Sequence, residues 1–123
     1  TKESFPVEEW QNYASPVWNY ARQDLPETDV LNVKVARSDK DEKHLCPMPL
    51  NITRRALRMW SNPGDVVFSP FMGIGSEGVV SIEQGRRFIG TELNPIYFRQ
   101  AVRNLQDAEN SGAMGDMFSE EVA

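Results

Sequence analysis

A glycine-rich turn between a short apolar run and a helical pattern narrows the folds that this chain can adopt. Residues 66–68 read Val-Val-Phe, a β-branched run flanked by turn residues, which predicts a strand buried on both faces of a parallel sheet. The glycine-rich turn occupies residues 69–75. A helix with an inward apolar face is predicted to follow from Ser76, and Gly85 suits the left-handed residue beyond its end. Its inward residues would be Val79, Val80 and Ile82.

Two further elements complete this unit. Residues 87–91 predict a second strand that delivers Glu92 to its carboxyl end. Asn94 suits an N-cap and Pro95 a first helical position, so a further helix is predicted there. Its buried stripe would comprise Phe98, Ala101, Val102 and Leu105. The order indicates a βαβα unit with a right-handed crossover, and therefore an α/β fold with a short parallel sheet and flanking helices.

The chain before this unit is less regular. Ile52, Ala56, Met59 and Trp60 recur at helical spacing, which predicts a helix of about three turns that ends at the Asn-Pro-Gly of residues 62–64, and we expect Trp60 to lie in the core. Residues 29–33 could form one more short strand, and the charge-dense stretch 37–43 reads as a linker. We expect an irregular extension over 1–42, a ligand-binding α/β unit over 43–109 and an irregular tail over 110–123.

Composition fits one soluble domain. The 123 residues are 40% hydrophobic and 25% charged, with neither a membrane-length apolar run nor a secretory pattern, so we expect a cytoplasmic protein without membrane contact. The single cysteine, Cys46, agrees with a reducing compartment. A net charge of −5 does not indicate a basic surface that would bind DNA by itself. We interpret the arginine clusters, including Arg86-Arg87, as solvated faces. We expect no metal site, since His44 is the only histidine.

The turn and the following acidic residue suggest a ligand site. Glycines let a ligand approach bare backbone at a helix N-terminus, where N–H groups are unpaired. An acidic residue at the end of the next strand can accept hydrogen bonds from two ribose hydroxyls. Here these parts are Gly73, Gly75 and Glu92, with nineteen residues between the first and the last. That spacing agrees with the ~20 residues expected of such a unit.

Two ligand classes fit this pattern. Residues 73–78 read G-x-G-x-x-G, which is typical of nicotinamide dinucleotide sites. However, residues 70–72 widen the loop, and Glu77 near the helix start would repel a pyrophosphate. A ligand without phosphates, such as zwitterionic S-adenosylmethionine, fits the charge pattern better.

Four segments together resemble one protein family. Residues 69–76, Ser-Pro-Phe-Met-Gly-Ile-Gly-Ser, are similar to the D-P-F-x-G-x-G-[ST] cofactor loop of DNA amino-methyltransferases from restriction-modification systems and phages. Residues 61–65 resemble the family's N-P-G-D lead-in, residues 85–98 its G-R-x-F-I-G-x-E-x-x-x-x-Y-F segment, and residues 44–50 its H-P-x-Q-K-P-L lead. Their order resembles the permuted subgroup, in which the catalytic half precedes the cofactor half.

The resemblance implies a partial Rossmann-like methyltransferase fold that binds S-adenosylmethionine. In the family's arrangement, Phe71, Gly73 and Gly75 surround the methionine and sulfonium end, and Glu92 holds the ribose. The remaining implied cofactor positions are Ser69, Pro70, Ser76, Asn94 with Pro95 beside the adenine, and His44 with Pro49 and Leu50 on the far side. Two departures, Ser69 for the usual Asp and Met48 for Lys, imply weaker or reshaped binding.

The family's catalytic loop has no full counterpart here. That loop is a polar residue followed by Pro-Pro-aromatic, which binds the target amino group of a base flipped from the helix. The 123 residues contain no Pro-Pro. The nearest match is residues 15–18, with Ser15 and Trp18 as candidates, against the alternative of a structural turn with Trp18 in the core.

The resemblance therefore implies the cofactor-binding part of an enzyme that methylates the exocyclic nitrogen of adenine or cytosine in DNA, inactive alone. DNA would be contacted through a missing or partner region. A non-catalytic assembly module, favoured by Ser69, and a nicotinamide-binding fragment remain alternatives. Because a sheet this short has open edges, we also expect a homodimer or pairing with a complementary catalytic half.

Overall fold

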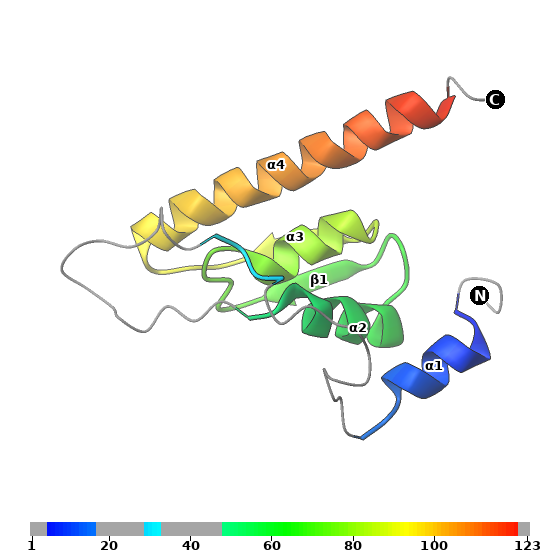
Figure 1. Ribbon diagram of the computed structural model, residues 1–123. Helices are drawn as coiled ribbons and strands as arrows, with labels where there is room; N and C mark the ends of the chain where they lie inside the picture. Colours follow the sequence, from blue (N-terminus) through cyan, green and yellow to red (C-terminus); the bar gives the residue numbers. More distant parts are fainter. Residues whose placement is uncertain (1–4, 17–28, 33–47, 121–123) are drawn as a thin grey trace.

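The computed structural model describes residues 5–16, 29–32 and 48–120, with side chains described as far as residue 112. Its elements, in chain order, are α1 (Val7–Tyr13), α2 (Leu50–Trp60), β1 (Val66–Ser69), α3 (Ser76–Glu83), β2 (Arg87–Gly90) and α4 (Pro95–Glu120) (Figure 1). The predicted order of strand, turn, helix, strand and helix is confirmed. No helix in the described part of the chain is long and apolar enough to cross a membrane.

The two strands form a parallel sheet, with Val66 opposite Arg87 and Ser69 opposite Gly90. Helix α3 joins them and packs against both strands, and it also contacts α2 and α4 (Figure 1). Since the strands are parallel, their carboxyl ends meet at one edge, where the residues after Ser69 and Gly90 lie together.

The α3 layer packs closely on the sheet because α3 carries a glycine near its start. A Cβ at Gly78 would collide with the Phe88 ring at 2.7 Å and with the Leu105 side chain. Gly78 is the third glycine of the G-x-G-x-x-G sequence, the position that permits close packing of helix and strand. The apolar core comprises Leu50, Met72, Ile74, Val79, Val80 and Ala101.

The expectation that β1 is buried on both faces is wrong. Phe68 is 61% exposed, and Val66 and Ile89 on the same face are also exposed. Side chains alternate across a strand, so this face is opposite the one that bears the buried Ser69 and packs against α3. Among the described residues, nothing covers the face of Phe68; we call Val66, Phe68 and Ile89 the open sheet face.

The predicted core position of Trp60 on α2 is also wrong, although the helix itself is confirmed. Trp60 is 82% exposed, whereas the polar Asn51, Thr53 and Arg55 are buried. The physical reason is that polar partners lie against this helix: the Arg55 guanidinium sits 5.1 Å from the Tyr13 ring centre on α1.

Ion pairs hold α2 to its surroundings. Arg54 pairs with Asp29 and, at 2.9 Å, with Glu83 of α3. Arg58 pairs with Glu9 of α1 at 2.6 Å, and this hydrogen-bonded contact lowers the pKa of the Glu9 carboxyl. Asp29 and α1 are therefore connected to the α/β unit through arginines of α2.

The two ends of the chain differ from expectation. The extension 1–42 contains helix α1, so it is not irregular throughout. Residues 29–32 form no strand, because the Asp29 carbonyl instead accepts the Leu50 N–H at the start of α2; Val33 lies outside the described residues. Helix α4 continues to Glu120 rather than fraying after residue 109. On α4, Ala101 is fully buried as expected, whereas Phe98 is exposed.

Arg86 is buried, contrary to the interpretation of a solvated face. Its guanidinium donates hydrogen bonds to the carbonyl oxygens of Ser61 at 2.8 Å and Gln84 at 2.6 Å. Burial lowers the pKa of Arg86, while these carbonyls satisfy its N–H groups. Arg86 thereby fixes the turn before β1 to the start of β2, whereas its neighbour Arg87 is exposed as expected.

Candidate functional site

Three hydrogen bonds at Thr91, the residue after β2, hold the end of β1 and the glycine loop, residues 70–75. The Thr91 N–H donates to the Ser69 carbonyl at 3.0 Å, and the Thr91 carbonyl accepts the Met72 N–H at 3.0 Å. The Thr91 hydroxyl donates to the Pro70 carbonyl at 2.7 Å. The pairing of the strands thus continues past β1 before the chain turns, so the loop is wider than a direct strand-to-glycine junction.

Both glycines at the bend have left-handed backbone conformations, with φ of +54° at Gly73 and +90° at Gly75. Such angles are unfavourable for other residues, which explains the glycines. A Cβ at Gly75 would lie 3.3 Å from the Ala101 Cβ, whereas one at Gly73 would meet nothing within 4 Å. The backbone at Gly73 is therefore open to a ligand.

Glu92 lies directly beside this bend. Its Oε2 accepts the Gly73 N–H at 3.0 Å, and its Oε1 accepts the Asn94 N–H at 2.8 Å. An ionised carboxylate offers about four lone-pair sites, so each oxygen can accept a further hydrogen bond. The half-buried Glu92 is thus held by the backbone on one side and can accept two neighbouring hydroxyls on the other.

Two apolar side chains flank these groups. Phe71 in the loop is 84% exposed, and Leu93, directly after Glu92, is fully exposed. Exposed large apolar side chains beside a carboxylate and bare backbone are typical of a site that an amphipathic ligand covers. The next helix begins at once, with the Asn94 side chain accepting the Ile96 N–H at 2.9 Å as the predicted N-cap.

Comparison with known proteins places this geometry in a family. The family model for DNA methylases of the N6/N4 type matches residues 2–103. The chain belongs to the DNA amino-methyltransferase family. The predicted α/β methyltransferase fold is confirmed by similarity to the structure of TTHA0409 from Thermus thermophilus, described as a putative DNA modification methylase complexed with S-adenosyl-L-methionine. That similarity has a TM-score of 0.61 at 26% identity and covers 88% of this chain and 36% of TTHA0409.

Sequence relatives agree with this assignment. The chain is 39% identical over 75 residues to the DNA adenine methyltransferase YhdJ of Escherichia coli (strain K12), which covers 61% of this chain and 26% of that protein. It is 35% identical over 85 residues to the type II methyltransferase M1.MboII of Moraxella bovis, covering 69% of this chain and 30% of that protein. The chain therefore spans about a quarter to a third of the length of these methyltransferases.

Most of the predicted site residues meet at the carboxyl edge of the sheet. These are Ser69, Pro70, Phe71, Gly73, Gly75, Ser76, Glu92 and Asn94. Pro49 lies instead at the N-cap of α2. Ser15 follows α1, which contacts only α2 among the described elements and lies across the molecule from the start of α4 (Figure 1). His44 and Trp18 are outside the described residues.

Four further residues of the site, Met72, Thr91, Leu93 and Asn104, were not among those predicted from the sequence. Met72 is a buried residue of the loop itself, and the Asn104 side-chain amide donates to the Ile74 carbonyl at 2.8 Å. Asn104 lies three residues after the buried Ala101, on the helix face that was predicted to be apolar. A polar residue on such a face was the sequence signal that could have indicated its role.

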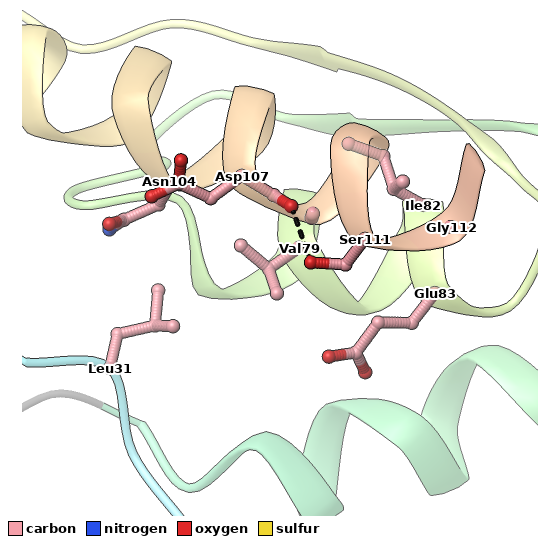
Figure 2. A pocket seen from close by; sticks show the side chains of 9 residues that line it. Leu31, Val79, Ile82, Glu83, Asn104, Asp107, Ser111 and Gly112 are labelled. Carbon is pink, nitrogen blue, oxygen red and sulfur yellow. Dashed lines mark hydrogen bonds between the residues drawn. The ribbon is translucent and has the colours of Figure 1, made fainter. Parts of the chain in front are cut away.

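A hollow of about 490 Å³ lies elsewhere, between residues 29–32, α3 and α4 (Figure 2). Its lining is mainly apolar, and neither Glu92 nor a glycine of the loop contributes to it. The carboxylate and bare backbone are therefore not in this hollow but on the open edge of the sheet. The described residues contain no group of three side chains that could hold a metal ion.

Proposed function

We propose that this chain is the S-adenosylmethionine-binding part of a DNA methyltransferase that acts on the exocyclic amino nitrogen of adenine or cytosine. The observation that carries the proposal is the Glu92 carboxylate held against Gly73 N–H at the end of β2. The residues present fit the cofactor: Glu92 has acceptor capacity for two ribose hydroxyls, and the space beside Gly73 is open. Bound S-adenosylmethionine would supply the electrophilic methyl group.

The chain's own residues would bind and orient this cofactor. Glu92 would accept the ribose hydroxyls, and the backbone at Gly73 and Gly75 would face the methionine and sulfonium end. Phe71 would cover that end from solvent, and Asn94 would border the adenine. Pro49 and His44 are proposed to lie on the far side of the cofactor.

Ser69 should affect how tightly the chain binds S-adenosylmethionine. It is buried at the end of β1 and its carbonyl accepts the Thr91 N–H, so its place in the sheet is intact. Its short hydroxyl cannot offer the ionic contact to a ligand ammonium that an aspartate would. We infer that S-adenosylmethionine binds here in the same orientation as in a loop that begins Asp-Pro-Phe, but more weakly.

Methyl transfer would need groups beyond those described here. The acceptor nitrogen must be held in line with the methyl group by side-chain and carbonyl acceptors. The 123 residues contain no Pro-Pro-aromatic sequence, and residues 15–18, with Ser15 and Trp18, are the nearest match on the N-terminal side of the cofactor loop. We propose that a missing or partner region supplies the catalytic loop and the DNA contacts, so that this chain alone binds the cofactor without methylating DNA.

Calorimetric titration of the chain with S-adenosylhomocysteine and with NAD tests this proposal. We expect saturable binding of S-adenosylhomocysteine and none of NAD, because Glu77 in the first turn of α3 opposes a pyrophosphate. The same preparation should transfer no methyl group to DNA. Preference for NAD, or no binding of either ligand, would contradict the proposal.

The open sheet face suggests a partner. Val66, Phe68 and Ile89 are exposed together, beside strand edges that carry unpaired backbone groups in the described part of the chain. We propose that the complementary catalytic region covers this face in the whole enzyme and that a second copy covers it in the isolated chain.

Phe68→Lys tests the covering of this face. We expect the chain to self-associate with rising concentration in analytical ultracentrifugation, and Phe68→Lys to remain monomeric because a charge replaces the exposed ring. Val7→Lys, an equally drastic change at an exposed site on α1, is the control and should leave association unchanged. A monomeric parent chain, or equal effects of both substitutions, would refute self-association through this face.

A further inference from the structure

We propose that Asn104 of α4 is a positioning residue that sets the glycine loop for the amino-acid end of the cofactor. This inference rests on the proposed function. Asn104 Nδ2 donates a hydrogen bond of 2.8 Å to the Ile74 carbonyl, in the middle of the Gly-Ile-Gly bend. Asn104 thus contacts the loop from behind, through the backbone.

The peptide unit between Ile74 and Gly75 is held at both ends. Its carbonyl accepts from Asn104, and its N–H, on Gly75, donates to the Met72 carbonyl at 2.8 Å. Gly75 has no Cβ to restrict rotation of this peptide, and its φ of +90° is only one of the conformations open to glycine. The Asn104 and Met72 hydrogen bonds together therefore select one orientation of the peptide, and Asn104 is the side chain that holds its carbonyl end.

Two features fix Asn104 itself. Ala101, one turn earlier on α4, is fully buried, and its Cβ would lie 3.3 Å from a Cβ at Gly75. Gln100 Nε2 donates to Asn104 Oδ1 at 2.9 Å. With its oxygen accepting from Gln100, the Asn104 amide must present its NH₂ group to Ile74. Helix α4 therefore delivers a hydrogen-bond donor of defined direction to the loop.

Binding of the ribose and binding of the amino-acid end of the cofactor should depend differently on the Asn104 donor. Glu92 would hold the ribose, and it is bound to Gly73 and Asn94 without using Asn104. The peptide that Asn104 orients lies between Gly73 and Gly75, at the proposed methionine end, and leads directly into the N-terminus of α3. Loss of the donor should therefore affect ligands that carry the amino-acid end more than ligands that lack it.

The experiment compares Asn104→Leu with the parent chain in titrations with two ligands. S-Adenosylhomocysteine carries the amino-acid end, and 5′-methylthioadenosine lacks it. We expect the dissociation constant for S-adenosylhomocysteine to rise roughly five- to tenfold, as loss of one hydrogen bond predicts. That for 5′-methylthioadenosine should change less than about twofold, within the scatter of an uninvolved surface change. Asn104→Gln, which retains a donor, should recover part of the affinity.

Asn110→Leu makes the same change at an exposed position of α4 and should leave both affinities unaltered. Should Asn104→Leu fail to fold, Asn104→Asp keeps the shape and the acceptor for Gln100 while removing the donor. Equal losses for the two ligands, or no loss for either, would overturn the proposal.

Hydrogen exchange of the Gly75 amide in the ligand-free chain gives a second readout by NMR. Faster exchange at Gly75 in Asn104→Leu than in the parent, with unchanged exchange at Val80 in α3, supports the positioning role. Unchanged exchange at Gly75 contradicts it. If the parent chain does not bind S-adenosylhomocysteine, the proposed function fails, while this exchange measurement still decides whether Asn104 orients the loop.

Discussion

Glu92→Ala is expected to raise the dissociation constant for S-adenosylhomocysteine by more than about tenfold, since hydrogen bonds to a charged acceptor contribute ~1.5–3 kcal/mol. The substitution removes the acceptors for the ribose hydroxyls. It also leaves the Gly73 and Asn94 N–H groups without the partner that fixes them. Isothermal titration calorimetry measures the change directly.

Glu109→Gln provides the matched control for the lost charge, because Glu109 is an exposed carboxylate on α4 outside the proposed site. The Glu109→Gln chain should bind S-adenosylhomocysteine as tightly as the parent chain does. Thermal unfolding of the ligand-free variants establishes that they remain folded during the titration. Near-parental affinity of folded Glu92→Ala would show that Glu92 does not hold the ribose.

Gly78→Val is expected to lower the free energy of unfolding by about 2–3 kcal/mol, the cost of overpacking a close contact. Even the first added carbon would meet the Phe88 ring at 2.7 Å and the Leu105 side chain. A β-branched side chain also fits poorly in a helix interior, so no gain in helix propensity offsets the collision substantially. Urea unfolding followed by circular dichroism measures the difference.

Gly112→Ala is the control for replacing a helical glycine. A Cβ at Gly112 meets nothing within 4 Å, so this change should stabilise the chain by roughly 0.5–1 kcal/mol through helix propensity. A Gly78→Val chain as stable as the parent would show that α3 does not approach β2 as closely as the structure indicates.

The elements could be predicted where local backbone chemistry defines them. Gly85 adopts a φ of +71° just after α3, as its position predicts, and Asn94 caps α4 with its side chain. The Asn-Pro-Gly of residues 62–64 ends α2 after Trp60. The proximity of Glu92 to Gly73 was also predictable, because parallel strands bring their carboxyl ends to one edge.

Burial could not be predicted from the same signals. An apolar run such as that around Phe68 indicates a strand, but only the neighbouring elements decide which face is covered. The surroundings of α2 could not be predicted for a related reason: Arg55 and Arg54 have partners on α1, α3 and residues 29–32, all distant in sequence. The contact between Asn104 and Ile74 spans thirty residues, and local spacing indicated only that a polar group lay on a buried face.

A crystal structure of the chain with bound S-adenosylhomocysteine would show whether Glu92 holds the ribose beside the glycine loop. We expect the ribose hydroxyls within hydrogen-bond distance of the Glu92 carboxylate, with the homocysteine along Gly73 to Gly75 and Phe71 over it. Ligand seated in the hollow between α3 and α4, or a ribose without contact to Glu92, would contradict the account.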